Sequence, residues 1–186
     1  MTSKARFRAD LLDWRNSLSI ETWNQKSQQI CQHLLSLDQL KNASCVHVFW
    51  PISEKREVDI RPVVNQLFES GCAVFLPIVD GGRLKPGQFF GASYLKKGHY
   101  GVLEPVFDAE KEMPEPDVVL VPALAVDGLG NRIGYGKGYY DAFLSEVKSC
   151  KIVPLFAKQV VDGIPSEPHD VPVDILVTEE GVYPLK

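Results

Sequence analysis

The chain has 186 residues, of which 45% are hydrophobic and 24% are charged. This length and mixture are typical of one soluble globular domain spanning residues 1–186, and they exclude a disordered chain. The 20 basic and 24 acidic side chains give a net charge of −4. That balance argues against a general nucleic-acid-binding protein, because such proteins usually present a basic surface.

Neither a membrane span nor a secretory leader is predicted. The longest apolar run, from Val118 to Val126, falls far short of the roughly 20 residues that a spanning helix needs. No apolar stretch follows the basic residues at the N-terminus, as it would in a signal peptide. The four cysteines match neither a zinc motif nor a disulfide framework. We therefore expect a cytoplasmic protein with free thiols and no membrane contact.

Two helices are predicted at the start of the chain. Apolar side chains recur from Phe7 to Leu18 at the spacing of one helical face. Ser19 is placed to cap a second helix, which runs to about Leu37.

Basic residues cluster where the first helix begins. Lys4 and Arg8 are one turn apart, so they share a helix face. Positive charge is unfavourable at a helix N-terminus, where the helix dipole is itself positive. These side chains therefore need either a solvated surface or an anionic partner, and the sequence pattern alone favours the surface.

A strand–helix–strand unit follows. Cys45–Trp50 is rich in β-forming residues and is ended by a proline, Asp59–Glu69 has helical spacing, and Ala73–Pro77 is again strand-like. Such a unit predicts two parallel strands joined by a right-handed crossover.

The second half of the chain alternates strands with loops and one helix. Residues 80–116 are rich in Gly and Pro and predict short, irregular or antiparallel strands. Val118–Val121 is continuously apolar, as in a central strand buried on both faces. A helix is expected over Tyr139–Val147, with strands over Lys151–Phe156 and Asp174–Val177. This alternation predicts an α/β fold, a three-layer α/β/α domain with a mostly parallel, Rossmann-like sheet.

The most informative segment, Pro122–Asp141, follows the predicted central strand and leads into a helix. Glycines at every second position of Gly134–Gly138 would let the backbone approach an anion closely. Unpaired N–H groups at a helix N-terminus, with Arg132 and Lys137 nearby, would complete a phosphate site. The spacing matches neither a Walker A loop nor the dinucleotide-binding fingerprint, and a tight strand-to-helix turn is the simpler alternative.

Pro122–Asp141 closely resembles the signature of the 5-formyltetrahydrofolate cyclo-ligase family. Weaker similarities follow in the family's order along almost the whole chain. They are the basic helix with Lys4, Arg6 and Arg8, the Glu57–Asp59 segment, the Gly101-x-x-Glu104-Pro105 turn and the run Gln159–Glu179. The resemblance implies a Rossmann-like scaffold similar to that of sugar-phosphate isomerases and CoA transferases.

The resemblance implies an ATP site built from the first helix and the glycine-rich segment. Cations of the helix would contact the ATP phosphates, and the segment would wrap the triphosphate and the reacting end of the folate. Some relatives carry Arg at the position of Tyr135, which leaves a phosphate contact from this tyrosine open. The implied ATP-binding residues are Lys4, Arg6, Arg8, Arg132, Gly134, Tyr135, Gly136, Lys137, Gly138, Tyr139 and Tyr140.

A folate site is implied beside the ATP site. Glu57 would lie against the folate near the formyl group, although in isolation it is one loop charge among several, and Glu54 is a competing position. Trp50 would stack on the pterin or pack in the core at the strand end. The implied folate-binding residues are Trp50, Glu57, Tyr135, Gly136, Lys137, Gly138 and Tyr139, and the implied catalytic residues are Arg132, Lys137 and Glu57.

A Mg²⁺ site is also implied. Its first ligand would be Asp141, in the first turn of the predicted helix, and its second would be Asp174, with Asp170 as the alternative. Mg²⁺ prefers oxygen ligands and is often held by one or two carboxylates together with phosphates. A favourable interaction with the helix dipole is the simpler role for Asp141.

The implied reaction is the ATP-dependent cyclisation of 5-formyltetrahydrofolate to 5,10-methenyltetrahydrofolate, with release of ADP and phosphate through a phosphorylated formyl intermediate. Phosphoryl transfer needs positioning and charge neutralisation more than a nucleophile, and the chain has no convincing Ser-His-Asp or Cys-His set. Two alternatives stay open, a sugar-phosphate isomerase-like enzyme and a non-catalytic module that binds folate or nucleotide. The expected partners are the folate and ATP, and the expected state is a monomer.

Overall fold

The computed structural model describes residues 4–98, 101–106 and 113–185, with side chains from Arg6 onwards. Its helices are α1 (Lys4–Asn16), α2 (Ile20–Ser36), α3 (Asp38–Lys41), α4 (Arg61–Glu69) and α5 (Tyr139–Ser145), with short 3-10 turns η1 (Ser53–Lys55), η2 (Ala92–Tyr94) and η4 (Ala157–Gln159). Its strands are β1 (Cys45–His47), β2 (Ala73–Asp80), β3 (Arg83–Gln88), β4 (Leu95–Lys97), β5 (Leu103–Pro105), β6 (Val118–Leu120), β7 (Ala125–Asp127), β8 (Arg132–Ile133), β9 (Cys150–Pro154), β10 (Val160–Val161), β11 (Ile175–Thr178) and β12 (Gly181–Pro184).

A seven-stranded sheet forms the centre of the fold, in the order β12-β11-β9-β6-β1-β2-β3. The strands from β11 to β2 are parallel to one another, and the edge strands β12 and β3 run antiparallel to their neighbours. Val46 of β1 pairs with Val74 of β2 on one side and with Val118 of β6 on the other. The predicted α/β fold with a mostly parallel sheet is therefore confirmed.

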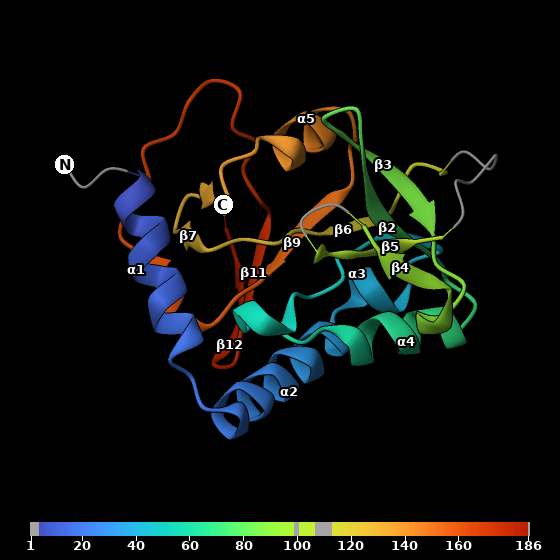
Figure 1. The fold of residues 1–186 in the computed structure, drawn as a ribbon, viewed down its shortest axis with the longest axis horizontal. Coiled ribbons are helices and arrows are strands. Elements are labelled where there is room, and N and C mark those ends of the chain that lie inside the picture. The colour runs from blue at the N-terminus through green and yellow to red at the C-terminus, as the bar shows by residue number, and fades with distance from the viewer. Residues whose placement is uncertain (1–3, 99–100, 107–112, 186) are drawn as a thin grey trace.

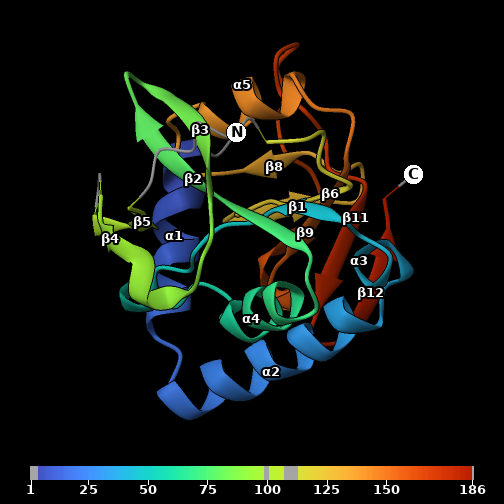
Figure 2. The same cartoon turned by 90° about the vertical axis from the view of Figure 1, so that its right-hand side faces the viewer.

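Both faces of the sheet are covered, with α2 and α4 on one face and α5 on the other (Figures 1 and 2). Alternate residues of a strand point to opposite faces. Val118 and Leu120 belong to the core cluster that α2 and α4 cover. Val119 and Val121 belong to the cluster beneath α5. This two-sided burial is the physical reason for the uninterrupted apolar run in the sequence.

The first two helices form as predicted, with one difference at their junction. The Ser19 side chain caps α2 by accepting a hydrogen bond from the Thr22 backbone N–H, at 3.0 Å. Ser19 has an extended backbone, with ψ of 156°, so the chain leaves the helical conformation before it. Consequently α1 ends at Asn16, and Leu18 packs against the core from the connection rather than from the helix.

The glycine-rich segment differs from the predicted strand-to-helix loop. Strands β7 and β8 form an antiparallel hairpin within it, and β10 pairs with β7 on the other side. The buried Asp127 carboxylate closes the hairpin turn by accepting hydrogen bonds from the Leu129 and Asn131 backbone N–H groups, at 3.0 and 2.9 Å. The strands have only three and two residues, too few for a periodic pattern. Helix α5 begins at Tyr139 as predicted but ends two residues early, at Ser145.

The Gly- and Pro-rich region contains antiparallel pairs, as predicted. Strand β3 folds back on β2, and β4 pairs with β5 within the part of this region that the structure describes. No helix in the described ranges combines the length and apolar character that a membrane crossing requires.

His47 lies at the carboxyl end of β1 and is 0% exposed. Its ring packs on Phe143 of α5, with 4.4 Å between ring centroids. Within the described residues, neither ring nitrogen has a hydrogen-bond partner. Burial therefore lowers the pKa of His47 from 6.5 to about 3, and the ring is neutral at physiological pH.

We expect acid to destabilise the protein through His47. The unfolded chain protonates this ring near pH 6.5 and the folded protein only near pH 3, so the unfolded state binds more protons in between. The free energy of unfolding should fall by about 2 kcal/mol between pH 7 and pH 5 from this group. Urea titrations of the wild type and of His47→Leu should show this contribution missing in the variant.

The difference between the two proteins at pH 8 reports the packing change alone and serves as the internal reference. A difference in unfolding free energy that stays constant from pH 8 to pH 5 would contradict the prediction.

Candidate active site

A pocket of about 390 Å³ opens at the carboxyl ends of β1 and β6. The chain beyond β1 contributes Phe49 and Trp50, and the chain beyond β6 contributes Pro122. Arg8 of α1 and Asp170, from the loop before β11, complete the wall together with the glycine-rich segment. The carboxyl edge of a parallel sheet is where α/β proteins usually bind ligands.

One end of the pocket is held by a buried ion pair. Arg132 of β8 donates from Nη1 to Asp141 Oδ1 at 2.8 Å and to the Val171 carbonyl at 3.2 Å. The Arg132 side chain is 5% exposed, and its burial lowers the pKa of the guanidinium, while the Asp141 carboxylate opposes that shift. These two bonds hold the start of α5 against the loop that contains Val171.

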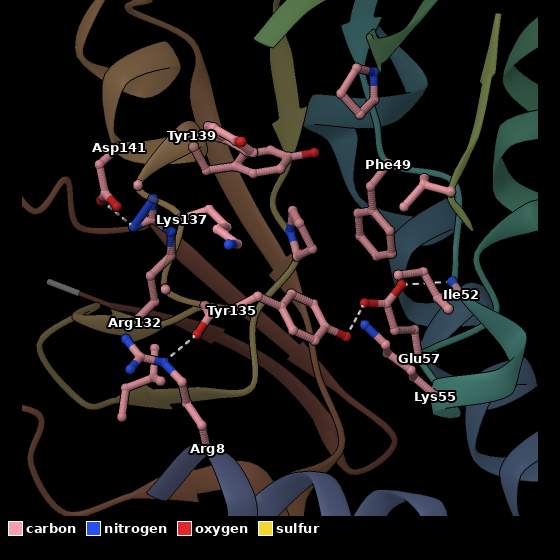
Figure 3. A pocket seen from close by; sticks show the side chains of 18 of the residues that line it. Arg8, Phe49, Ile52, Lys55, Glu57, Arg132, Tyr135, Lys137, Tyr139 and Asp141 are labelled. Carbon is pink, nitrogen blue, oxygen red and sulfur yellow. Dashed lines mark hydrogen bonds and ion pairs between the residues drawn. The ribbon is translucent and has the colours of Figure 1, made fainter. Parts of the chain in front are cut away.

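The glycine-rich segment approaches α1 at this same end. Arg8 Nε donates to the Gly134 carbonyl at 2.9 Å (Figure 3). Gly136 and Gly138 have φ of 84° and 70°, in the left-handed region that favours glycine. A Cβ on Gly136 would lie 3.1 Å from Arg8 Cζ, so a side chain here would press on the arginine. These glycines therefore allow a left-handed backbone, and Gly136 also allows close contact with Arg8.

The opposite end of the pocket holds a buried polar network around Glu57. Tyr135 donates from its hydroxyl to Glu57 Oε1 at 2.5 Å, and the Ile52 backbone N–H donates to Glu57 Oε2 at 2.7 Å (Figure 3). Arg15 donates to the Tyr135 hydroxyl at 2.6 Å, and the Lys55 ammonium lies 4.5 Å from the centroid of the tyrosine ring. Burial, followed by the nearby Glu57 carboxylate, raises the pKa of Tyr135.

Tyr135 thus spans the pocket, because its backbone belongs to the glycine-rich segment and its hydroxyl reaches the far wall (Figure 3). Arg8, Arg132, Lys137 and Asp141 lie at one end, whereas Phe49, Lys55 and Glu57 lie at the other (Figure 3). The first end offers cations and carboxylates suited to phosphate groups. The second offers aromatic surface and one buried carboxylate, suited to a flat, hydrogen-bonding ring.

The structure brings most of the sequence-predicted residues together in this pocket. They are Arg8, Trp50, Glu57, Arg132, Gly134, Tyr135, Gly136, Lys137, Gly138, Tyr139, Tyr140 and Asp141. Glu54 is exposed on η1, so Glu57 is the glutamate that faces the pocket. Trp50 serves both predicted roles, since it lines the pocket and packs on Phe89, with ring centroids 5.7 Å apart.

Two of the predicted residues whose side chains the structure describes, Asp174 and Arg6, do not line the pocket. Asp174 precedes β11 at the opposite, amino-terminal edge of the sheet, where its carboxylate accepts a hydrogen bond from the Lys151 backbone N–H at 2.9 Å. Of the two aspartates considered as the second Mg²⁺ ligand, Asp170, the alternative in the sequence prediction, is the one that lines the pocket. The Arg6 side chain is 76% exposed and points to Asp10 at 3.9 Å. The Lys4 side chain lies outside the described part of the chain.

Sequence reasoning missed Arg15 and Lys55. Arg15 lies in the last turn of α1, where a basic residue is favourable with the helix dipole and needs no other explanation. Lys55 stands among several loop charges that all have the pattern of solvated surface. Only the folded chain brings both to Tyr135.

Known proteins resemble this chain along nearly its full length. A model of the 5-formyltetrahydrofolate cyclo-ligase family matches residues 1–179. The 5-formyltetrahydrofolate cyclo-ligase of Escherichia coli K12 is 29% identical over 177 residues, which cover 91% of this chain and 96% of that protein. The mouse protein of the same name is 28% identical over 197 residues, covering 97% of this chain and 95% of its own.

Solved structures give the same picture. The 5,10-methenyltetrahydrofolate synthetase of Aquifex aeolicus superposes with a TM-score of 0.85 at 33% identity, covering 98% of this chain and 93% of that one. A 5,10-methenyltetrahydrofolate synthetase from Mycoplasma pneumoniae superposes with a TM-score of 0.75 at 22% identity, covering 96% and 99%, and supports the fold.

Proposed function

The chain belongs to the 5-formyltetrahydrofolate cyclo-ligase family, and from this premise we propose that the pocket at the carboxyl edge of the sheet is its active site. The enzyme converts 5-formyltetrahydrofolate to 5,10-methenyltetrahydrofolate with ATP as co-substrate. The observation that carries the site proposal is the convergence of the signature segment, Arg8 and Glu57 on one cavity. Residues from Arg8 to Asp170 line this one cavity, so we propose a single domain over residues 1–186, and we expect it to act as a monomer.

Two bond exchanges make up the proposed reaction. The formyl oxygen attacks the γ-phosphorus, the bond to the bridging oxygen breaks, and ADP leaves. N10 of the folate then attacks the activated formyl carbon, the carbon–oxygen bond breaks, and phosphate leaves while the N10 proton passes to solvent. Neither step needs a protein nucleophile, so the enzyme must chiefly align the two substrates and neutralise charge.

The phosphate end of the pocket supplies this neutralisation. Arg8, Arg132 and Lys137 lie where they would meet a triphosphate from several sides. Charge-assisted hydrogen bonds to phosphate oxygens are stronger than neutral ones, and they strengthen further in a pocket that excludes water. Backbone N–H groups of Gly134–Gly138 would add donors without bulk.

The other end would hold the folate. Glu57 is 5% exposed. Carboxylate oxygens accept hydrogen bonds, so Glu57 would accept them from N–H groups of the pterin. Trp50 and Tyr139 offer ring faces for stacking. This arrangement would point the formyl group toward Lys137 and Arg132, the proposed catalytic cations.

The pocket also suits a magnesium ion carried in with ATP. Asp141 and Asp170 both line it, and carboxylate oxygens are ligands that Mg²⁺ prefers. Among the described residues no group of three or more His, Cys, Asp or Glu side chains could form a complete metal cage. Such a site fits an ion shared between one or two carboxylates and phosphates, where it would neutralise phosphate charge.

We expect the purified chain to form 5,10-methenyltetrahydrofolate from 5-formyltetrahydrofolate when ATP and Mg²⁺ are present. Product is followed by its absorbance, and reactions without ATP or with a non-hydrolysable analogue serve as controls. Folded protein that binds both substrates without turnover would instead identify a binding module, and activity on sugar phosphates alone would favour the isomerase alternative.

Substitution of Arg8 should weaken ATP binding selectively. Arg8→Met keeps much of the side-chain volume but removes the charge-assisted bonds, so the KM for ATP should rise about tenfold while the KM for the folate changes little. Steady-state kinetics with each substrate varied in turn provide the measurement. Arg8→Lys is the matched control, since it keeps the charge, and an unchanged KM for ATP in Arg8→Met would reject the phosphate role.

Mg²⁺ titration can test which aspartates bind the ion. In Asp141→Asn and Asp170→Asn we expect the Mg²⁺ concentration for half-maximal activity to rise about tenfold, because the ion loses a charged ligand. The same variants should show less thermal stabilisation by Mg²⁺ in the presence of ADP. If Asp174→Asn alone produced these effects, the original sequence assignment would stand and the pocket assignment would fall.

A further inference from the structure

Arg15 is a buried cation that the proposed chemistry does not use. Its side chain is 2% exposed, and it lies behind the pocket rather than among the residues that line it. Removing a guanidinium from water costs several kcal/mol unless hydrogen bonds and an opposite charge compensate for it. The hydrogen-bond partners of Arg15 show how its buried charge is compensated.

The partners of Arg15 come from two segments that lie far apart in the sequence. Its Nε donates to the Lys55 carbonyl of η1 at 2.6 Å, and its Nη2 donates to the Tyr135 hydroxyl at 2.6 Å. The same Nη2 lies 3.9 Å from Glu57 Oε1, so the buried charge has a buried counter-charge. One guanidinium thus joins the end of α1, the η1 turn and the glycine-rich segment.

The chemistry of Arg15 fixes the direction of the network. A guanidinium donates hydrogen bonds and accepts none, so the Tyr135 oxygen must be the acceptor in this contact. The tyrosine hydrogen is then directed to Glu57 Oε1, the second hydroxyl partner, at 2.5 Å. Arg15 thereby decides that the Tyr135 hydroxyl donates to Glu57 and does not accept from it.

Both oxygens of Glu57 are thereby held in place. Oε1 accepts from the Tyr135 hydroxyl, and Oε2 accepts from the Ile52 backbone N–H at 2.7 Å. Donors at both oxygens set the plane of the carboxylate and leave its other lone pairs for the pocket, which Glu57 lines. Through Lys55, whose ammonium lies over the Tyr135 ring, Arg15 also steadies the neighbouring wall.

We propose that Arg15 is a positioning residue for the folate, acting through the Tyr135 hydroxyl to orient the Glu57 carboxylate. This inference rests on the proposed function, in which Glu57 meets the folate and the glycine-rich segment meets ATP. It assigns Tyr135 to the folate end of the pocket and accounts for a tyrosine whose hydroxyl faces away from the phosphate cations.

Two variants test the proposal. Tyr135→Phe removes only the hydroxyl, and Arg15→Met removes the charge while keeping an unbranched apolar stem. In each, the KM for 5-formyltetrahydrofolate should rise about tenfold while the KM for ATP stays within about twofold, because only the Glu57 end is disturbed. The double variant should be little worse than either single variant, since the two side chains act as one unit.

Arg61→Met is the matched control. Arg61 also forms a hydrogen-bonded pair with a carboxylate, that of Asp59, but it lies outside the pocket lining. The Arg61→Met substitution should lower the melting temperature without changing the KM for the folate. Thermal unfolding of every variant separates lost stability from lost positioning, and Tyr135→Phe alone decides the matter if Arg15→Met does not fold.

An unchanged KM for the folate in folded Tyr135→Phe would overturn the proposal, as would equal rises in both KM values. Failure of the proposed function looks different, because the wild type itself would then make no methenyl product. In that case calorimetric titration of 5-formyltetrahydrofolate into the wild type and Tyr135→Phe still tests the positioning role, and equal affinities would reject it.

Discussion

Burial of the parallel sheet on both faces is the constraint on which the rest of this structure depends. With α2 and α4 on one face and α5 on the other, β1 and β6 are buried along their whole length, and β9 is buried from Ile152 onwards. Polar groups that must meet a ligand are then confined to the strand ends. The chain accordingly gathers its cations, glycines and carboxylates at the carboxyl edge of β1 and β6, where the pocket opens.

Charge around that pocket is arranged as two separate ion pairs, one at each end. Arg132 is matched by Asp141 at one end, and Arg15 is matched by Glu57 through Tyr135 at the other. Removing the charges of either pair from water would cost free energy if the pair had no other partners. Hydrogen bonds to backbone groups or to a hydroxyl compensate for this cost in each pair. A preorganised site of this kind suits a reaction that depends on aligning two substrates more than on a reactive side chain.

Several parts of this arrangement could be predicted from the sequence because they depend on local pattern. The run Val118–Val121 indicated a strand buried on both faces and Ser19 indicated a helix cap, and the structure has both. The β7–β8 hairpin could not be predicted in the same way, since its strands are too short to show periodicity and its turn depends on the buried Asp127 carboxylate. Asp174, which the resemblance favoured as a metal ligand, precedes the parallel strand β11 and therefore lies at the amino-terminal edge, away from the pocket.

The sequence by itself determined the α/β class, the parallel sheet and the glycines and cations of the segment that leads into α5, because burial periodicity and glycine spacing act over a few neighbouring residues. Only the tertiary structure decided which carboxylates share the pocket and which arginine of α1 is buried. Asp170, Arg15 and Lys55 have unremarkable neighbours in the chain, and their roles arise when segments more than 30 residues apart are packed together at one edge of the sheet. Burial then turns ordinary surface charges into hydrogen-bonded pairs, because a charge removed from water must find a partner or lose its charge.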